Sequence, residues 1–258
     1  MEPVFRSLEI AAGIARRVTG TRITFHGLEH LPRRGGAVVA INHTGYIDFL
    51  PAALAATERK RRLRFMIKAE MTQVRVVNFL ITHSKTIPVD RSAGSGAYAE
   101  AVRRLREGEL VAVYPEATIS RSFELKEFKS GAARMALEAQ APLIPLIVWG
   151  AHRMWTKDHP RRLGRRKIPI TVVVGEPLHP AGDVHELNAH ELDAHELEAA
   201  LRASMTTILH RVQESYPHPA GAHWVPRRLG GGAPTLAEAK QLDEAELAER
   251  ARKRSDHR

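Results

Sequence analysis

The sequence contains no cysteine and no long apolar run. Without cysteine there is no disulfide, no thiol nucleophile and no cysteine-ligated zinc, and we expect a reducing compartment. No stretch approaches the roughly 20 consecutive apolar residues that a membrane-spanning helix needs. The N-terminal residues lack the basic start and small-residue cleavage site of a secretory signal. Aromatic residues make up only 5% and do not interleave with basic ones, which argues against nucleic acid as a partner.

Basic residues outnumber acidic residues along the chain. The 258 residues include 39 Lys or Arg against 29 Asp or Glu, which gives a net charge of +10. This balance favours polyanionic partners such as anionic lipid headgroups or phosphorylated substrates. Two basic runs, 59–62 and 161–167, suit docking on an anionic membrane, although such runs also occur as solvated loops. A chain of this length forms one domain, or one domain with appendages.

The first 20 residues have an amphipathic pattern. Apolar residues such as Val4, Leu8, Ile14 and Val18 recur at helical spacing, with charged residues between them. One interpretation is a helix that packs on the protein core. The other is a helix that lies in the interface of a bilayer and is basic on its polar side.

Between residues 21 and 180, short β-branched runs alternate with longer helical stretches. Strands are predicted at 22–25, 37–41, 64–67, 86–89, 110–113, 143–148 and 170–174. Helices are predicted at 49–56, 97–107 and 130–139. This alternation indicates an α/β domain with a mostly parallel central sheet flanked by helices.

The composition changes after Pro180. Residues 181–225 are predicted to pack on the domain as a C-terminal helix, whose pattern runs from 183 to 216. Its His-Glu pairs at His185, His190 and His195 suggest a metal site, but five helical residues turn the chain by about 500°. Neighbouring histidines then point roughly 140° apart and cannot share an ion. Residues 226–234 are predicted to be a flexible linker and 235–258 a charged, helix-prone tail, so that 226–258 forms a separate appendage.

His43 and Asp48 stand at a predicted corner between a strand and a helix. A buried strand ends at Asn42, a turn follows, and a helix begins near Ile47. Open α/β sheets place ligands at the carboxyl ends of their strands, so His43 is a candidate base. An ionised Asp48 at the helix N-terminus can hold one imidazole nitrogen and leave the other free. The alternative is a structural His–Asp pair that caps the helix.

Three further predicted strands deliver polar groups at their carboxyl ends. Lys68 follows one strand, Arg91 follows another, and Glu116 follows a third. Arginine and lysine suit phosphate. One base and two cations, each after a strand, indicate a catalytic face that binds an anion.

Four blocks between residues 21 and 180 resemble the glycerolipid acyltransferase family, in particular 1-acylglycerol-3-phosphate acyltransferases of the PlsC type. They are Asn42-His43-x-x-x-x-Asp48, the run KTIPVDR from Lys85 to Arg91, the run YPEAT from Tyr114 to Thr118 with FKSGA downstream from Phe128, and the run APLIPL from Ala141. The third block resembles the family's Phe-Pro-Glu-Gly-Thr. Together the four blocks, in this order, are specific for the family, whereas each alone is a weak signal.

The resemblance implies direct acyl transfer in phospholipid synthesis. His43, oriented by Asp48, takes the proton from the free hydroxyl of a lysophosphatidate-like acceptor, and the oxygen attacks an acyl thioester without an acyl-enzyme. The donor is acyl-CoA or acyl carrier protein, with no metal and no organic cofactor. The expected location is peripheral, on the cytoplasmic face of the cell membrane. The substrate-binding residues expected at the site are Lys68, Arg91, Glu116, Ala117, Thr118 and Arg121.

The chain departs from the family pattern at three positions. Lys85 and Ala117 replace glycines, and Ile119 stands where the family often has arginine, so we expect Arg121 to substitute for it. These departures leave other acceptors open, namely a glycolipid, a lyso-ornithine lipid or glycerol 3-phosphate. A non-catalytic module that binds anionic lipid is the alternative from another class of function.

Overall fold

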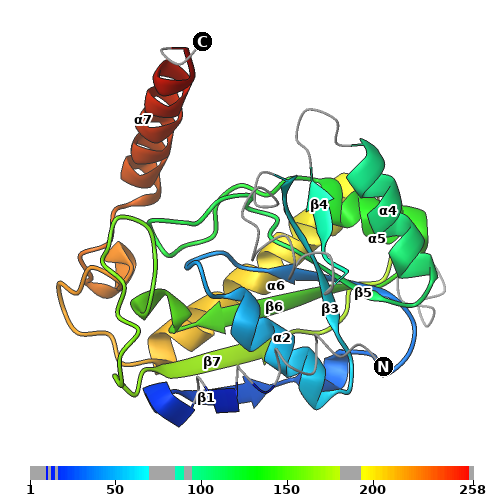
Figure 1. The fold of residues 1–258 in the computed structure, drawn as a ribbon, viewed down its shortest axis with the longest axis horizontal. Coiled ribbons are helices and arrows are strands. Elements are labelled where there is room, and N and C mark those ends of the chain that lie inside the picture. Colours follow the sequence, from blue (N-terminus) through cyan, green and yellow to red (C-terminus); the bar gives the residue numbers. More distant parts are fainter. Residues whose placement is uncertain are drawn as a thin grey trace.

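The fold is built on a seven-stranded sheet. The computed structural model describes residues 10, 13–14, 17–69, 85–89, 95–180 and 193–255. The sheet has the order β1-β7-β6-β2-β5-β3-β4 (Figure 1). The strands are β1 (Arg22–His26), β2 (Ala37–Ile41), β3 (Leu63–Lys68), β4 (Ile87–Val89), β5 (Leu110–Val113), β6 (Leu143–Trp149) and β7 (Pro169–Val174). All seven predicted strands are present, and their ends lie within one residue of the prediction.

The strand pairing confirms an α/β fold with a mostly parallel sheet. Strands β6, β2, β5, β3 and β4 pair in parallel, whereas β7 runs antiparallel to β6 and carries β1 beside it in parallel. The central strands β2, β5 and β6 are buried at every position. Continuous apolar strands of this kind are typical of sheets with both faces covered.

Helices cover the two faces of the sheet unequally (Figure 1). They are α2 (Phe49–Glu58), α4 (Ser95–Arg106), α5 (Gly131–Ala139) and α6 (Ala194–Ser215). Alternate residues of β2 belong to separate cores, because successive strand side chains point to opposite faces. Val38 and Ala40 pack in the core formed with α4, α5 and α6, whereas Val39 and Ile41 pack in the core formed with α2.

The C-terminal helix of the domain, α6, begins later than predicted. Asp193 is its N-cap, and its side chain accepts the N–H of His195 and of Glu196 while Glu196 reaches back to the N–H of Asp193. This capping box defines a helix start, so α6 does not run unbroken from residue 183. Two of the three His-Glu pairs, at 185 and 190, lie outside the described residues.

The segment predicted to be a flexible linker is packed against the body instead. It contains a short 3-10 helix, η4 (Arg227–Leu229), and Ala233 is fully buried. A Cβ atom on Gly231 would lie 1.9 Å from the carbonyl oxygen of Val225, so only glycine fits there. The charged tail that follows is the helix α7 (Leu236–Ser255), which stands out from the sheet (Figure 1). No helix within the described ranges is long and apolar enough to cross a bilayer.

Candidate active site

Asn42 fixes the chain at the end of β2. Its buried side chain accepts the N–H of Val148 through Oδ1 at 2.7 Å and donates to the carbonyl of Val148 through Nδ2 at 3.0 Å. These two bonds continue the β2–β6 pairing by one residue. The next residue, His43, therefore stands at the carboxyl edge of the parallel strands, and α2 begins shortly after it at Phe49.

His43 and Asp48 face each other across this corner, as predicted. Nδ1 of His43 lies 3.5 Å from Oδ2 of Asp48, a long distance for a hydrogen bond. The same oxygen accepts the N–H groups of Thr44 and Gly45, both at 2.7 Å. Asp48 is fully buried, whereas 19% of the His43 side chain is exposed. The carboxylate therefore holds the turn and orients an imidazole that solvent can reach.

Gly45 allows the turn to pack against the chain that follows β6. A Cβ atom at this position would lie 2.9 Å from the Cα of His152 and 2.8 Å from the carbonyl oxygen of Trp155. The N–H of Tyr46 donates to that same oxygen at 3.0 Å. A larger residue at position 45 would push the His43 corner away from its support.

The ring of Tyr114 stacks on the imidazole of His43. The two ring centroids are 4.0 Å apart, and the planes are inclined by 22°. Burial, and after it the charge of Asp48, raises the pKa of Tyr114 well above its ordinary value, so the phenol stays neutral. Burial also raises the pKa of Asp48, while its hydrogen bonds with His43 and the turn oppose this shift. Nε2 of His43 has no hydrogen-bond partner among the described residues.

Glu116 braces the backbone of His43. Its Oε1 accepts the N–H of His43 at 2.8 Å, and its Oε2 accepts the N–H of Lys126 at 3.0 Å. The N–H of Ser120 donates to the carbonyl of His43 at 2.7 Å. Burial raises the pKa of Glu116 to about 7, although the two backbone hydrogen bonds lower it. The structure places this residue, which the sequence predicts to bind substrate, between two loops that it holds together.

Two residues that replace family glycines have a left-handed backbone. The φ angle is +59° at Ala117 and +53° at Lys85, in the region that glycine adopts at little cost. Beside Ala117, the hydroxyl of Thr118 accepts a hydrogen bond from Nζ of Lys126 at 2.6 Å. Lys126 is a cation of this region that the sequence analysis did not single out.

The structure describes the two other predicted cations only in part. Lys68 is the last residue of β3, and its backbone pairs with Val89 of β4. Because β3 is parallel to β5, Lys68 lies toward the same edge of the sheet as the loop that carries Glu116. The side chain of Lys68 and the whole of Arg91 lie outside the described residues.

Arg121, which the sequence predicts as a ligand of the acceptor phosphate, lies in a cluster of carboxylates. Its guanidinium is buried and pairs with three carboxylates, those of Asp158 at 2.5 Å, Glu246 at 2.8 Å and Asp243. Burial lowers its pKa, but the hydrogen bonds to Asp158 and Glu246 outweigh this and raise the pKa above the ordinary value. Asp243 lies 122 residues further along the chain, in α7, so no local pattern indicated this pairing.

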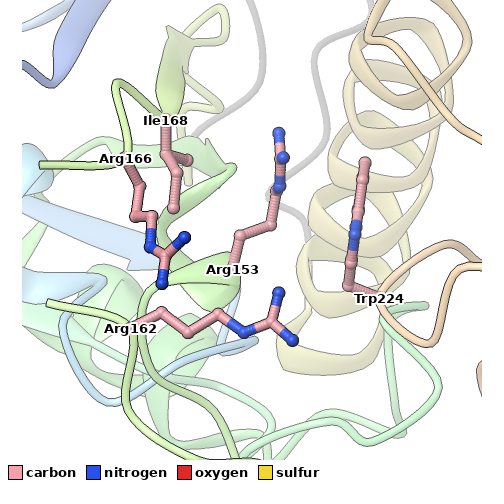
Figure 2. A pocket seen from close by; sticks show the side chains of 5 residues that line it. All are labelled: Arg153, Arg162, Arg166, Ile168 and Trp224. Atoms are coloured by element: carbon pink, nitrogen blue, oxygen red, sulfur yellow. The ribbon is translucent and has the colours of Figure 1, made fainter. Parts of the chain in front are cut away.

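A second basic region surrounds a cavity of about 380 Å³ (Figure 2). It is lined by Arg153, Arg162, Arg166, Ile168 and Trp224. The guanidinium of Arg153 lies over the Trp224 ring, 4.3 Å from its centroid. Arg162 and Arg166 belong to the basic run 161–167, and neither has a carboxylate partner within the described part of the chain. Arginine is a common ligand of phosphate, but the guanidinium of Arg153 is engaged by the Trp224 ring and by the hydroxyl of Tyr216.

The arrangement at the corner defines a class of chemistry. A buried carboxylate orients an imidazole whose second nitrogen is free, so the pair can take a proton from a hydroxyl group. The chain matches a family model described as Acyltransferase over residues 22–149, which includes the whole corner and the Glu116 loop. The chain belongs to this family and is an acyltransferase.

Proteins named 1-acyl-sn-glycerol-3-phosphate acyltransferase are among its relatives. The one from Bacillus subtilis is 27% identical over 63% of this chain and 77% of its own length. The one from Limnanthes douglasii is 32% identical over 66% of this chain, which spans 59% of that relative. The crystal structure of PlsC from Thermotoga maritima, an acyltransferase for 1-acyl-sn-glycerophosphate, matches with a TM-score of 0.63 over 82% of this chain and 81% of its own, at 20% identity. This likeness shows the common fold.

Proposed function

We propose that the protein transfers a fatty acyl chain from an acyl thioester to the free hydroxyl of lysophosphatidate, in phospholipid synthesis. The observation that carries the proposal is the His43–Asp48 pair, with Nδ1 directed at a buried carboxylate and Nε2 free. The substrate assignment is supported by the names of the relatives from Bacillus subtilis and Limnanthes douglasii. Acyl-CoA and acyl carrier protein are the two donors that fit the reaction.

In the proposed step, Nε2 of His43 takes the proton as the acceptor oxygen attacks the thioester carbonyl carbon. The C–S bond then breaks, the thiolate leaves, and it recovers the proton from the imidazolium. Asp48 stabilises the imidazolium that forms between these events, because its carboxylate faces Nδ1. No group on the protein becomes acylated, and no metal or organic cofactor takes part.

One observation favours a second candidate within the same family. Ile119 is buried and uncharged, and Arg121 already pairs with three carboxylates. In this arrangement neither position gives an acceptor phosphate an unpaired cation. A glycolipid or a lyso-ornithine lipid would need no such cation. The acceptor assay therefore has to compare lysophosphatidate with these other acceptors.

The proposal places the reaction on the cytoplasmic face of an anionic membrane, with the protein bound peripherally. Ile10, Ile14 and Val18 recur every four residues in the helical part of the N-terminal segment, and each is more than half exposed. The N–H of Lys167 donates to the carbonyl of Thr19 at 3.2 Å, so the basic run 161–167 adjoins this segment. Apolar side chains beside a basic run are typical of surfaces that dock on anionic lipid.

The test is an assay of purified protein with palmitoyl-CoA or oleoyl-CoA and a panel of acceptors. The panel contains lysophosphatidate, glycerol 3-phosphate, a lyso-ornithine lipid and a lysoglycolipid, and the products are identified by mass. We expect phosphatidate, the product with two acyl chains on the glycerol, from lysophosphatidate at a rate that exceeds the rates with the other acceptors. Preferred acylation of an unphosphorylated acceptor would overturn the substrate assignment, and no acylation of any acceptor with either donor or with acyl carrier protein would overturn the reaction.

A further inference from the structure

The C-terminal helix α7 is held to the body mainly by charged groups. Only Ala239, Asp243 and Glu246 of its described side chains are buried or half-buried, and their spacing of four and three residues puts them on one face. Ala239 is the only apolar residue among them, whereas the leucines of α7 (Leu236, Leu242 and Leu247) are exposed. The contact therefore depends on Asp243 and Glu246.

These two carboxylates lie in a cluster of three cations. Glu246 accepts from Arg121 at 2.8 Å and from Lys157 at 3.0 Å. Asp243 pairs with Arg121 and Lys126, and lies 3.4 Å from Lys157. Although burial raises it, the pKa of Glu246 falls to about 2 because Arg121 and Lys157 donate to the carboxylate. The helix thus presents two ionised groups to this cluster at neutral pH.

The cation cluster adjoins the His43 corner. The backbone of Lys126 donates to the same Glu116 carboxylate that accepts the N–H of His43. Arg121 follows Ser120, whose N–H donates to the carbonyl of His43 at 2.7 Å. Burial and, next, the charge of Glu246 raise the pKa of Tyr46, so α7 also comes close to the turn after His43.

The charges of the cluster are balanced only while α7 is docked. Three cations, Arg121, Lys126 and Lys157, face three carboxylates, and two of the three carboxylates belong to α7. Among the described residues, undocking of α7 leaves Asp158 as the single carboxylate paired with these cations, and a surplus of two positive charges. A phosphate monoester carries about two negative charges near neutral pH and several acceptor oxygens.

We infer that Arg121, Lys126 and Lys157 form an anion site for the phosphate monoester of the acceptor, and that α7 blocks this site in cis with Asp243 and Glu246. The inference rests on the proposed function, because it assigns the acceptor phosphate to these residues. It also accounts for Arg121, which pairs with three carboxylates while α7 is docked and keeps only Asp158 when α7 leaves. A phosphate that replaces both negative charges of the helix leaves the cations paired, so it can compete with the half-buried carboxylates of α7.

A double variant, Asp243→Asn with Glu246→Gln, tests the competition. Its matched control is Glu244→Gln with Glu249→Gln, which removes the same charge from exposed positions of α7. Acylation is measured against lysophosphatidate concentration in neutral detergent micelles. We expect the KM for lysophosphatidate to fall by at least about fivefold in the double variant, the lower end of typical coupling between sites. The control should keep the KM of the parent protein.

A second measurement follows the helix itself. Since the chain has no cysteine, spin labels can be attached at Leu247→Cys on α7 and at Thr207→Cys on α6, both exposed positions. We expect lysophosphatidate, and inorganic phosphate at higher concentration, to increase the mean distance between the labels and to broaden its distribution. A chloride salt at the same ionic strength as the phosphate should have a smaller effect.

The outcomes separate the inference from the proposed function. If lysophosphatidate is acylated but the double variant and its control have equal KM values and the label distance does not change, the inference is overturned and the function stands. If no lysolipid is acylated but lysophosphatidate still moves α7, the anion site stands and the proposed function is overturned.

Discussion

One oxygen of the buried Glu116 carboxylate accepts the backbone N–H of His43 at 2.8 Å, across 73 residues of sequence. The other oxygen accepts the N–H of Lys126, and Ser120 donates to the carbonyl of His43. Both backbone groups of His43 are thus fixed by the loop after β5, while Asp48 and Tyr114 fix its ring. The imidazole is held by its neighbours before any substrate arrives, as a positioned base requires.

The first prediction concerns the base. We expect His43→Ala to fold normally and to lose at least about 10²-fold in turnover, the usual contribution of a positioned general base. Asp48→Asn should also reduce turnover, because a neutral amide in place of the carboxylate that faces Nδ1 does not stabilise the imidazolium. Turnover is measured in the acceptor assay and folding by circular dichroism. Near-normal turnover of folded His43→Ala would exclude the proposed mechanism.

The second prediction concerns the pH dependence of stability. The pKa of Glu116 rises from an ordinary 4.5 to about 7 in the folded protein. The contribution of Glu116 to the free energy of unfolding is therefore fully present below pH 4.5 and is lost as the pH rises to about 7. At 1.36 kcal/mol for each unit of pKa shift, the loss is up to about 3 kcal/mol. Glu116→Gln should remove this loss. The free energy of unfolding of the variant, minus that of the parent, should therefore increase between pH 4.5 and 7.

Urea unfolding at several pH values checks this prediction. The exposed Glu244→Gln makes the same chemical change on the surface and serves as the control. A constant difference between Glu116→Gln and the parent across the pH range would contradict the assignment of the titration to Glu116.

The strands and the His43 corner were predictable because their causes are local. Apolar β-branched runs such as 37–41 favour strands through their own residues. The carboxyl ends of parallel strands lie at one edge of the sheet, which places the residues that follow them together. The spacing of His43 and Asp48 across a turn was enough to predict that they meet. The four family blocks added the reaction class, which the residues alone left open.

The environment of Arg121 was not predictable because its causes are distant in the sequence. Its partners Asp243 and Glu246 are 122 and 125 residues away, in a helix that reads as a solvated tail. A helix with so few buried apolar residues gives no periodic signal for the surface on which it docks. The buried role of Glu116 was hidden for a similar reason, since its partners are backbone groups that carry no residue-type signal.

The third prediction uses the two positions where this chain lacks the family glycines. Ala117 and Lys85 both have positive φ, which costs an L-residue roughly 1–2 kcal/mol. Ala117→Gly and Lys85→Gly relieve this cost but increase the entropy of the unfolded chain, by about 0.4–1 kcal/mol. We expect each to raise the free energy of unfolding by up to about 1 kcal/mol. Ala203→Gly, in the interior of α6, should lower it by a similar amount, and equal destabilisation by all three would show that the left-handed backbone carries no strain.

The last prediction concerns membrane attachment. Ile10, Ile14 and Val18 are exposed on the N-terminal segment, and Leu163 is half-exposed within the basic run 161–167. Apolar insertion and charge attraction should act together, so binding to vesicles with anionic lipid should weaken as salt rises. Replacing Ile10, Ile14 and Val18 with Asn should weaken binding at every salt concentration, because each side chain buries apolar area worth roughly 1.5–3 kcal/mol when fully inserted.

A second variant, with Arg162 and Arg166 replaced by Gln, should instead lose affinity mainly at low salt, where charge attraction is strongest. The control replaces the three exposed leucines of α7, Leu236, Leu242 and Leu247, with Asn, which changes the same number of apolar residues at another surface. Sedimentation with vesicles of neutral and anionic composition measures all three. Equal losses from the N-terminal and the α7 variants would show that binding follows general surface hydrophobicity. A specific loss from the N-terminal variant, with acylation of micellar acceptor unchanged, would separate attachment to the membrane from the chemistry at His43.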